Sequence, residues 1–360
     1  MSAVSEPQAV LRCWCGNVEL APYSDDYQLC ARCGTLITRR LPTKDLTHIR
    51  DEDGDLYGAK YFFERARELH FPDLTERARL DLSERCVYWL KALLAHRVPP
   101  GATLELGCSS GAFVALLASA GYQATGQDLS PAVTALARST FCVPVLTGPI
   151  EDQRLAEQSF DALILMDVLE HLLDPVGTLG AGIRALREDG LLLIQTPCFD
   201  PALSHADLVS AKHPFLAMLL PEEHLYLYSR ASVTKALNEL GFAHVAFLPA
   251  LFEMYDMFLL ASRTPIVPVE ETAWRQALRR SRESRIVEAL IDAFDGSRAR
   301  IPLQERLDQV EGDRARRLEV ILAQQAELER LHQQVSALTA RRRRLRRVLE
   351  RWTSFVRGRT

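Results

Sequence analysis

Short apolar segments alternate with amphipathic segments from residue 100 to residue 263, and this alternation constrains the fold more than any other feature. It predicts strands at residues 102–107, 122–130, 143–148, 160–168 and 190–197, and helices at 112–121, 131–140 and 176–189. A helix at 232–241 and closing strands at 244–251 and 256–263 complete the pattern. Because successive parallel strands need a crossover between them, we predict a doubly wound, Rossmann-like α/β domain with a seven-stranded sheet.

A turn of small residues follows the first predicted strand, in the stretch LELGCSSGAF at residues 104–113. Gly107 and Gly111 stand at the carboxyl end of that strand, just before a helix. A doubly wound sheet binds its ligands at this edge, where backbone N–H groups and a helix N-terminus face the ligand. The turn therefore predicts a ligand that approaches the main chain closely.

Asp128 closes the second predicted strand, 21 positions after Gly107. A carboxylate in this place can accept hydrogen bonds from both hydroxyls of a ribose, which indicates a nucleoside or nucleotide ligand. The alternative is that Asp128 caps the helix that begins in the stretch DLSP at residues 128–131.

The composition of the turn narrows the choice of nucleoside. Ser109 stands where a dinucleotide-binding turn has its middle glycine, which disfavours a nicotinamide-linked oxidoreductase. The turn has no basic residue, and Glu105 would repel a phosphate. A ligand with an ammonium and a sulfonium suits these residues, and S-adenosylmethionine (SAM) is such a ligand.

Five stretches resemble, in order and spacing, the motifs of class I SAM-dependent methyltransferases over about residues 100–263: LELGCSSGAF, GQDLSP, SFDALILMDVLEHLLDP, GLLLIQTP and EEHLYLYSRASVTKALNELGF. The resemblance implies a cofactor site whose parts follow the motifs. Its residues would be Glu105, Gly107 and Gly111 at the methionine, Asp128 at the ribose, Leu129 beside the adenine, Glu151 or Asp152 near the adenine amine, and Asp167 facing the transferred methyl.

The same resemblance implies that the methyl acceptor binds beside Asp167, so Asp167 is also counted among the candidate catalytic residues. A hydroxyl acceptor must lose its proton, so the site needs a base. The candidate bases are His224, which we prefer, and His171. The alternatives are that His171 only packs locally and that His224 only orders a lid. If a helix began near Asp167, then Asp167, Glu170 and His171 would share a face that could hold a divalent cation. The alternative is that Glu170 and His171 simply orient one another. Residues 198–228 are expected to form a lid over the acceptor.

Four cysteines lie close together near the N-terminus: Cys13, Cys15, Cys30 and Cys33. Two cysteine knuckles provide the four thiolates of a tetrahedral structural zinc site, so residues 1–45 are predicted to be a zinc-binding module. The alternative is four unligated thiols. With this module the chain is similar to zinc-bearing methyltransferases of sugar and surface-polysaccharide biosynthesis. That similarity implies a sugar or glycan hydroxyl as acceptor, with a sugar C-methyltransferase or a non-catalytic scaffold as alternatives.

The segments outside the predicted methyltransferase domain, residues 98–264, are expected to be helical. Residues 46–97 read as a helical extension and 265–312 as a helical linker. Within 313–360, apolar residues at heptad spacing over 318–352 predict a coiled coil that forms a homo-oligomer, with a single amphipathic helix as the alternative. Residues 341–360 contain nine Arg and one Glu, which suits an anionic membrane surface or a solvated helix end.

The overall charge and composition exclude two classes of partner or location. The net charge is −4 although the C-terminal 20 residues are strongly basic, so the acidic body is not expected to bind nucleic acid. No apolar run reaches the about 18 residues of a membrane span, and the N-terminus lacks a charged-then-apolar signal. We therefore predict a cytoplasmic protein that could be peripheral at the inner membrane face.

Overall fold

The computed structural model describes residues 11–42, 45–64 and 72–300, together with residues 306 and 311. The chain divides into two compact units, Met1–Phe294 and Asp295–Thr360. In the second unit, residues 295–300 are helical. The heptads at 318–352 and the Arg-rich end lie outside the described residues, so the coiled coil, the homo-oligomer and the membrane contact stay predictions.

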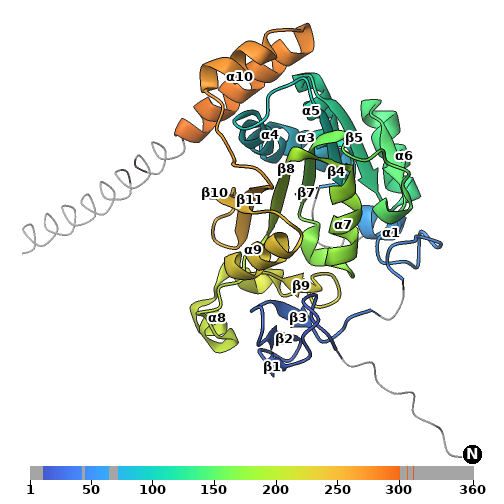
Figure 1. Ribbon diagram of the computed structural model, residues 1–360, viewed down its shortest axis with the longest axis vertical. Coiled ribbons are helices and arrows are strands. Elements are labelled where there is room, and N and C mark those ends of the chain that lie inside the picture. The colour runs from blue at the N-terminus through green and yellow to red at the C-terminus, as the bar shows by residue number, and fades with distance from the viewer. Residues whose placement is uncertain (1–10, 43–44, 65–71, 301–305, 307–310, 312–360) are drawn as a thin grey trace, which may run out of the picture. The chain divides into compact units, whose positions relative to one another are not determined.

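A seven-stranded sheet forms the centre of the first unit, in the order β10-β11-β8-β7-β4-β5-β6 (Figure 1). Strand β4 is parallel to β5 and β7, whereas β11 runs antiparallel to both of its neighbours, β8 and β10. This arrangement confirms the predicted Rossmann-like α/β fold. The strands are β4 Ala102–Leu106, β5 Gln123–Asp128, β6 Val145–Thr147, β7 Phe160–Met166, β8 Leu186–Pro197, β10 His244–Leu248 and β11 Asp256–Ser262.

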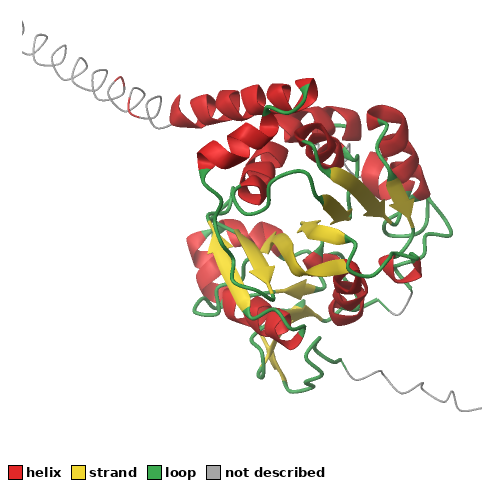
Figure 2. Cartoon of the chain, turned by 45° about the horizontal axis from the view of Figure 1, so that its top comes forward, coloured by secondary structure: helices red, strands yellow, loops and turns green. Residues whose placement is uncertain are grey.

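Helices cover both faces of this sheet (Figure 2). Side chains alternate along β7, so that Ile164 packs in one core cluster and Leu163 and Leu165 pack in the other. The first cluster includes residues of α4 Arg85–Leu94, α5 Ala112–Ala120, α6 Pro131–Phe141 and α10 Glu271–Leu278, and the second includes residues of α7 Pro175–Ala185 and α9 Arg230–Glu239. Both faces of the strands are buried, as a parallel sheet requires.

One predicted boundary is wrong. The helix expected to run to residue 189 ends at Ala185, and residues 186–189 belong to β8. Leu186 is buried and pairs with Phe160, while Arg187 forms an ion pair with Asp161 at 2.6 Å. The exposed polar residues at the start of β8 resemble the solvent face of a helix, and only the pairing with β7 makes them a strand.

The segment before the sheet is only partly helical. Helices α1 Ala59–Phe63, α3 Leu74–Ser83 and α4 lie within the predicted extension, but residues 45–58 contain no helix. We call residues 45–64 the strap, because they extend across the carboxyl ends of the central parallel strands.

The cysteine-rich segment is joined to the α/β part of the chain through a second sheet. Strands β1 Leu20–Pro22, β2 Tyr27–Cys30 and β3 Leu36–Thr38 form an antiparallel ribbon, and β3 pairs with β9 Tyr226–Leu227. Strand β9 lies inside the predicted lid, which also contains α8 His205–Ala211 and the 3₁₀ helix η3 Pro214–Met218. The ribbon and the lid therefore form one structural element.

Residues beyond the sheet also pack on the core. Trp274 and Leu278 of α10, followed by Ile291, are buried in the same cluster as α4 and α5. Residues 265–294 thus contribute to the core of the first unit. Among the described residues, no helix is both long enough and apolar enough to cross a membrane.

Replacement of Ile37 by alanine tests the joint between ribbon and lid. Ile37 is 0% exposed, pairs with Tyr226 and packs against residues of the central sheet, so truncation leaves a cavity. We expect the free energy of unfolding, measured by urea denaturation, to fall by about 2 to 5 kcal/mol. The control Val18→Ala, at a position 48% exposed, should change it by less than about 0.5 kcal/mol. Equal effects of the two variants would contradict the shared core.

Candidate functional site

The turn after β4 adopts a conformation that its glycines make accessible. Gly107 and Gly111 have φ values of +67° and +78°, in the left-handed region. A Cβ atom on Gly107 would lie 2.5 Å from Cγ2 of Val168, and one on Gly111 would lie 2.9 Å from Cβ of Ala137. The atoms that approach the turn closely include those of the loop after β7 and of α6, so the glycines also allow the elements around the site to converge.

Asp128, at the carboxyl end of β5, is buried and holds the turn. Its Oδ2 accepts a hydrogen bond from the Ser109 N–H at 2.9 Å, and its Oδ1 accepts one from the Ser130 N–H at 3.3 Å. The helix cap of α6 is Ser130, whose hydroxyl accepts from the Val133 N–H. The alternative role of Asp128 as the helix cap is therefore wrong. Burial raises the pKa of Asp128.

Glu105, near the end of β4, is buried, and its Oε2 has no hydrogen-bond partner among the described residues. Burial, and next the negative charge of Asp128, raise the pKa of Glu105 well above its usual range. A buried acceptor oxygen without a donor destabilises the protein, so a ligand that supplies an ammonium or hydroxyl would relieve two repelling carboxylates. The residues at this turn therefore fit the cationic, ribose-bearing SAM.

Asp167 lies at the carboxyl end of β7 but points to the N-terminal helices. It accepts hydrogen bonds from Arg85 of α4 and from Nε2 of Gln195 at 2.9 Å, and Trp89 donates to Oε1 of Gln195. Its φ of +56° places it outside any helix, and the 3₁₀ helix η2 begins at Leu169. The expected grouping of Asp167 with Glu170 and His171 on one helix face is therefore wrong.

His224 of the lid takes the place of Asp167 in that group. The rings of His171 and His224 lie edge to face with centroids 4.9 Å apart, and Nε2 of His171 is 3.9 Å from Oε1 of Glu170. Burial and next the neighbouring His224 lower the pKa of His171 to about 3, and burial lowers the pKa of His224. Both rings are therefore neutral near pH 7. We call Glu170, His171 and His224 the lid cluster.

The strap lies across the same end of the sheet (Figure 1). Glu52 accepts hydrogen bonds from the Ala132 N–H and the Ser130 hydroxyl at the start of α6. Further along, the Tyr57 hydroxyl lies 3.1 Å from Nδ1 of His171, and the Tyr61 hydroxyl donates to Oε2 of Glu223 at 3.1 Å. Sequence reasoning missed these residues, although their aromatic cluster at 56–63 was a visible signal.

The two candidate adenine-side carboxylates have different partners. Glu151 accepts a hydrogen bond from the Thr178 hydroxyl of α7 at 2.5 Å, whereas Asp152 lies 2.9 Å from Nε2 of His48 in the strap. Nδ1 of His48 lies 2.7 Å from Oδ2 of Asp45. Asp152 therefore helps to fasten the strap. The predicted adenine neighbour Leu129 lies just after β5, beside Ser130 in the sequence, and is half-buried.

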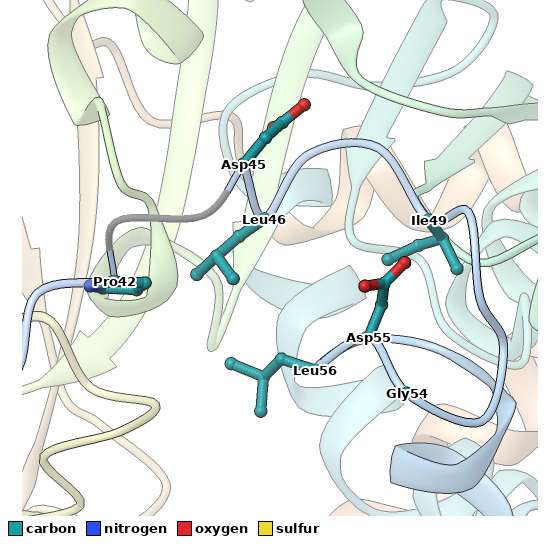
Figure 3. Close-up of a pocket in the computed structure, with 7 residues that line it drawn as sticks. All are labelled: Pro42, Asp45, Leu46, Ile49, Gly54, Asp55 and Leu56. Atoms are coloured by element: carbon teal, nitrogen blue, oxygen red, sulfur yellow. The ribbon is translucent and has the colours of Figure 1, made fainter.

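An open pocket of about 420 Å³ lies along the strap (Figure 3). The lining residues all belong to the segment just before and within the strap: Pro42, Asp45, Leu46, Ile49, Gly54, Asp55 and Leu56. Polar contacts hold the strap at several points along its length: at His48, at Glu52, and at Tyr57 and Tyr61.

The four N-terminal cysteines converge. Sγ of Cys13 lies 3.4 Å from Sγ of Cys33, Sγ of Cys15 lies 3.7 Å from Sγ of Cys30, and all four sulfur atoms lie within 4.8 Å of one another. Tetrahedral zinc at about 2.3 Å from each thiolate needs sulfur atoms about 3.8 Å apart. Gly16 and Gly34 follow the two knuckles with positive φ, as tight metal-binding turns require. The cluster is compatible with structural zinc.

The fastening of the strap should depend on pH. Hydrogen bonds to Asp152 and then to Asp45 raise the pKa of His48. The stabilisation is complete below the unfolded imidazole pKa of about 6.5 and is lost as pH rises through the raised folded value. The test is amide hydrogen exchange of residues 45–58, corrected for intrinsic rates and compared with the rest of the chain. This relative exchange should be slower at pH 6 than at pH 8. His48→Gln should remove that difference and the remote His96→Gln should keep it; the opposite pattern would contradict the fastening.

Comparison with known proteins identifies the central part of the chain. Residues 78–246 match the family model described as a methyltransferase domain. The ubiquinone biosynthesis O-methyltransferase of Xanthomonas campestris pv. campestris (strain B100) is 35% identical over 131 residues, which are 34% of this chain and 54% of that protein. The protein of the same name from Xanthomonas axonopodis pv. citri (strain 306) is 34% identical over 141 residues, covering 37% and 58%.

The chain thus spans little more than half the length of these curated relatives. Among solved structures, magnesium protoporphyrin IX methyltransferase from Synechocystis PCC 6803 is 19% identical, with 58% of this chain and 96% of that chain covered at a TM-score of 0.41. At this identity and TM-score the likeness carries no functional argument. Residues 78–246, a little under half of the chain, are thus similar to methyltransferase domains, and they contain most of the strands of the Rossmann-like sheet.

Proposed function

We propose that this protein transfers a methyl group from SAM to a hydroxyl of a small polar acceptor. The proposal is carried by two buried carboxyl groups, Glu105 near the end of β4 and Asp128 at the end of β5. Oε2 of Glu105 has no hydrogen-bond donor among the described residues, and both residues lie within the stretch that matches a methyltransferase domain. The pair suits a ligand with a positive charge and vicinal hydroxyls.

The cofactor residues are the ones that the family resemblance implies. Glu105 and the main chain at Gly107 and Gly111 would hold the methionine end, and Asp128 would hold the ribose. Leu129 and Asp152 would flank the adenine, and Glu151 is the weaker candidate because Thr178 of α7 already engages it. SAM, when bound, supplies a methyl group on a positively charged sulfur. The protein aligns that methyl with the acceptor and excludes water through the strap.

The acceptor side is built from the strap and the lid. Tyr57, Tyr61 and the lid cluster bring hydroxyl, imidazole and carboxylate groups together, which suits a polar substrate. The named relatives are O-methyltransferases, which favours oxygen over carbon as the methylated atom. A sugar or glycan hydroxyl is the acceptor that the zinc-bearing resemblance implies, and a phenolic hydroxyl is the competitor that the relatives suggest. The lid cluster, with His224 and His171, activates the hydroxyl.

Calorimetric binding of SAM tests the cofactor site. Asp128→Asn removes the charge on the ribose side, so SAM should bind at least about tenfold more weakly. The matched control is Asp161→Asn, because Asp161 is also a buried carboxylate that accepts a backbone N–H, from Ala102, but at the opposite end of the sheet. The control should bind SAM like the unaltered protein.

Two outcomes would overturn this assignment. If the unaltered protein binds neither SAM nor its demethylated product, the enzyme proposal fails. If both variants weaken binding equally, the carboxylate of Asp128 has no direct role in the site. The acceptor is then sought by mass analysis of products from nucleotide-sugars, lipid-linked glycans and phenols.

We further propose that the four cysteines hold one structural zinc ion. Four thiolates leave no open position for chemistry, so the ion would stabilise the ribbon that pairs with the lid. The purified chain should contain one zinc per molecule by elemental mass spectrometry. Cys30→Ser should lose that zinc and lower the midpoint of thermal unfolding, whereas Cys142→Ser, at an exposed cysteine outside the cluster, should not. The zinc site would be refuted if the purified chain contained no zinc and if chelators did not change its midpoint of thermal unfolding.

A further inference from the structure

A second group of metal-ligating side chains lies at the carboxyl end of β7, in the lid cluster. We infer that Glu170, His171 and His224 bind a divalent transition-metal ion. One ligand atom from each of the three lies within 4.8 Å of the others. Binding of the ion follows from these residues alone; its role at the methyl acceptor rests on the proposed function.

The hydrogen bonds of both imidazoles leave the ring nitrogens that face the cluster with their lone pairs. Nδ1 of His171 lies 3.0 Å from the carbonyl oxygen of Glu223, and Nδ1 of His224 lies 2.7 Å from the carbonyl oxygen of Met218. A carbonyl only accepts, so each of these contacts is a hydrogen bond when Nδ1 carries the proton, and the Tyr57 hydroxyl, 3.1 Å from Nδ1 of His171, is then a second acceptor. In this tautomer Nε2 keeps its lone pair in both rings. Histidines that ligate metals are held in this way, with the other N–H donated to a carbonyl or carboxylate.

The carboxylate is oriented in the same manner. Oε2 of Glu170 accepts a hydrogen bond from the Thr196 hydroxyl at 2.8 Å, and Oε1 lies 3.9 Å from Nε2 of His171. At 3.9 Å this approach is too long for a hydrogen bond. Ligand atoms around a bound ion lie about 3 to 3.5 Å apart, so loading the site needs the side chains to close by about 1 Å.

The charge of the cluster also favours a cation. Glu170 is 1% exposed, and its carboxyl oxygens contact the Thr196 hydroxyl and lie 3.9 Å from Nε2 of His171. The nearby Asp167 is paired with Arg85, whose guanidinium also lies over the rings of Trp89 and Phe252. A buried carboxylate is unfavourable unless hydrogen bonds or a cation compensate its charge, so a bound cation would stabilise the ionised form of Glu170.

The donor set indicates which ion and what use. Two imidazoles and one carboxylate favour Mn²⁺, Fe²⁺, Co²⁺ or Zn²⁺ over Mg²⁺ or Ca²⁺, and three protein ligands leave positions for an acceptor oxygen. A hydroxyl bound there has a lower pKa and releases its proton to water. Its oxygen then forms the bond to the methyl carbon as the carbon–sulfur bond of SAM breaks, leaving a neutral thioether. His171 and His224 then act as ligands and not as bases.

Metal titration of the full chain, with the cysteine site left loaded and no methyl donor present, tests the inference. Mn²⁺ followed by electron paramagnetic resonance, and Co²⁺ followed by visible absorption, should each show one site with nitrogen and oxygen ligands. Glu170→Gln, His171→Gln and His224→Gln should each weaken binding at least about tenfold. The control is His96→Gln. Like the two ligand histidines, His96 has its Nδ1 beside a backbone carbonyl, that of Ala92. Unlike them, it belongs to no group of three possible metal ligands in the described part of the chain.

The outcomes separate this inference from the proposed function. If neither ion binds outside the cysteine cluster, or if all three variants bind like the unaltered chain, the metal site is refuted even where SAM binds. If the ions bind and SAM does not, the site stands and the methyl-transfer role fails. Circular dichroism and the unfolding midpoint of each variant show whether it is folded. With an active acceptor, chelation should lower kcat/KM at least about tenfold, and added Mn²⁺ should restore it.

Discussion

The site depends on one constraint, the reversal of strand order beside β4. From β4 the chain moves outward to β5 and β6, then returns to β7 on the other side of β4. The crossovers on the two sides leave the carboxyl ends of β4, β5 and β7 without a covering helix, and a ligand can reach the main chain there. Glu105, Asp128 and Asp167 end or nearly end these strands, so the topology concentrates three carboxylates at one edge.

Carboxylates gathered in this way must be compensated, and the surrounding elements do so unequally. Asp167 is paired with Arg85 and Gln195, and Asp128 accepts two backbone N–H groups. Glu105 and Glu170 lack a cationic side chain among their described partners. These two buried carboxyl groups lie where a cationic cofactor and a divalent ion are proposed, and a bound cation would stabilise the ionised form of each, which gives both proposals the same physical origin.

The cysteine module influences the site through the backbone. Strand β3 pairs with β9, and the Tyr27 hydroxyl of the ribbon donates to the carbonyl of His224 at 3.0 Å. The Leu225 N–H, next in the chain, donates to the carbonyl of Glu170. A zinc-stabilised ribbon would therefore fix the segment that carries His224 against η2, so a structural ion far from the chemistry can still position a reactive side chain.

Much of the fold was predictable because it depends on local periodicity. The alternation of apolar strands and amphipathic helices predicted seven strands, and the structure has them in the expected domain. The strand start at residues 186–189 was missed because it is defined by pairing with Phe160, a partner distant in sequence. The strap was read as helical for a related reason: Glu52, Tyr57 and Tyr61 are ordered by α6, His171 and Glu223, not by their neighbours.

The sequence alone determined the α/β class, the glycine turn with Asp128 after it, and the four cysteines that could share an ion. These features come from residue types at short spacing, where backbone geometry leaves few choices. The tertiary structure decided which side chains meet: Asp167 with Arg85, Asp152 with His48, and His224 with Glu170 and His171. Those pairings join segments 50 to 100 or so residues apart, and no local preference specifies a contact that only the packing of whole elements creates.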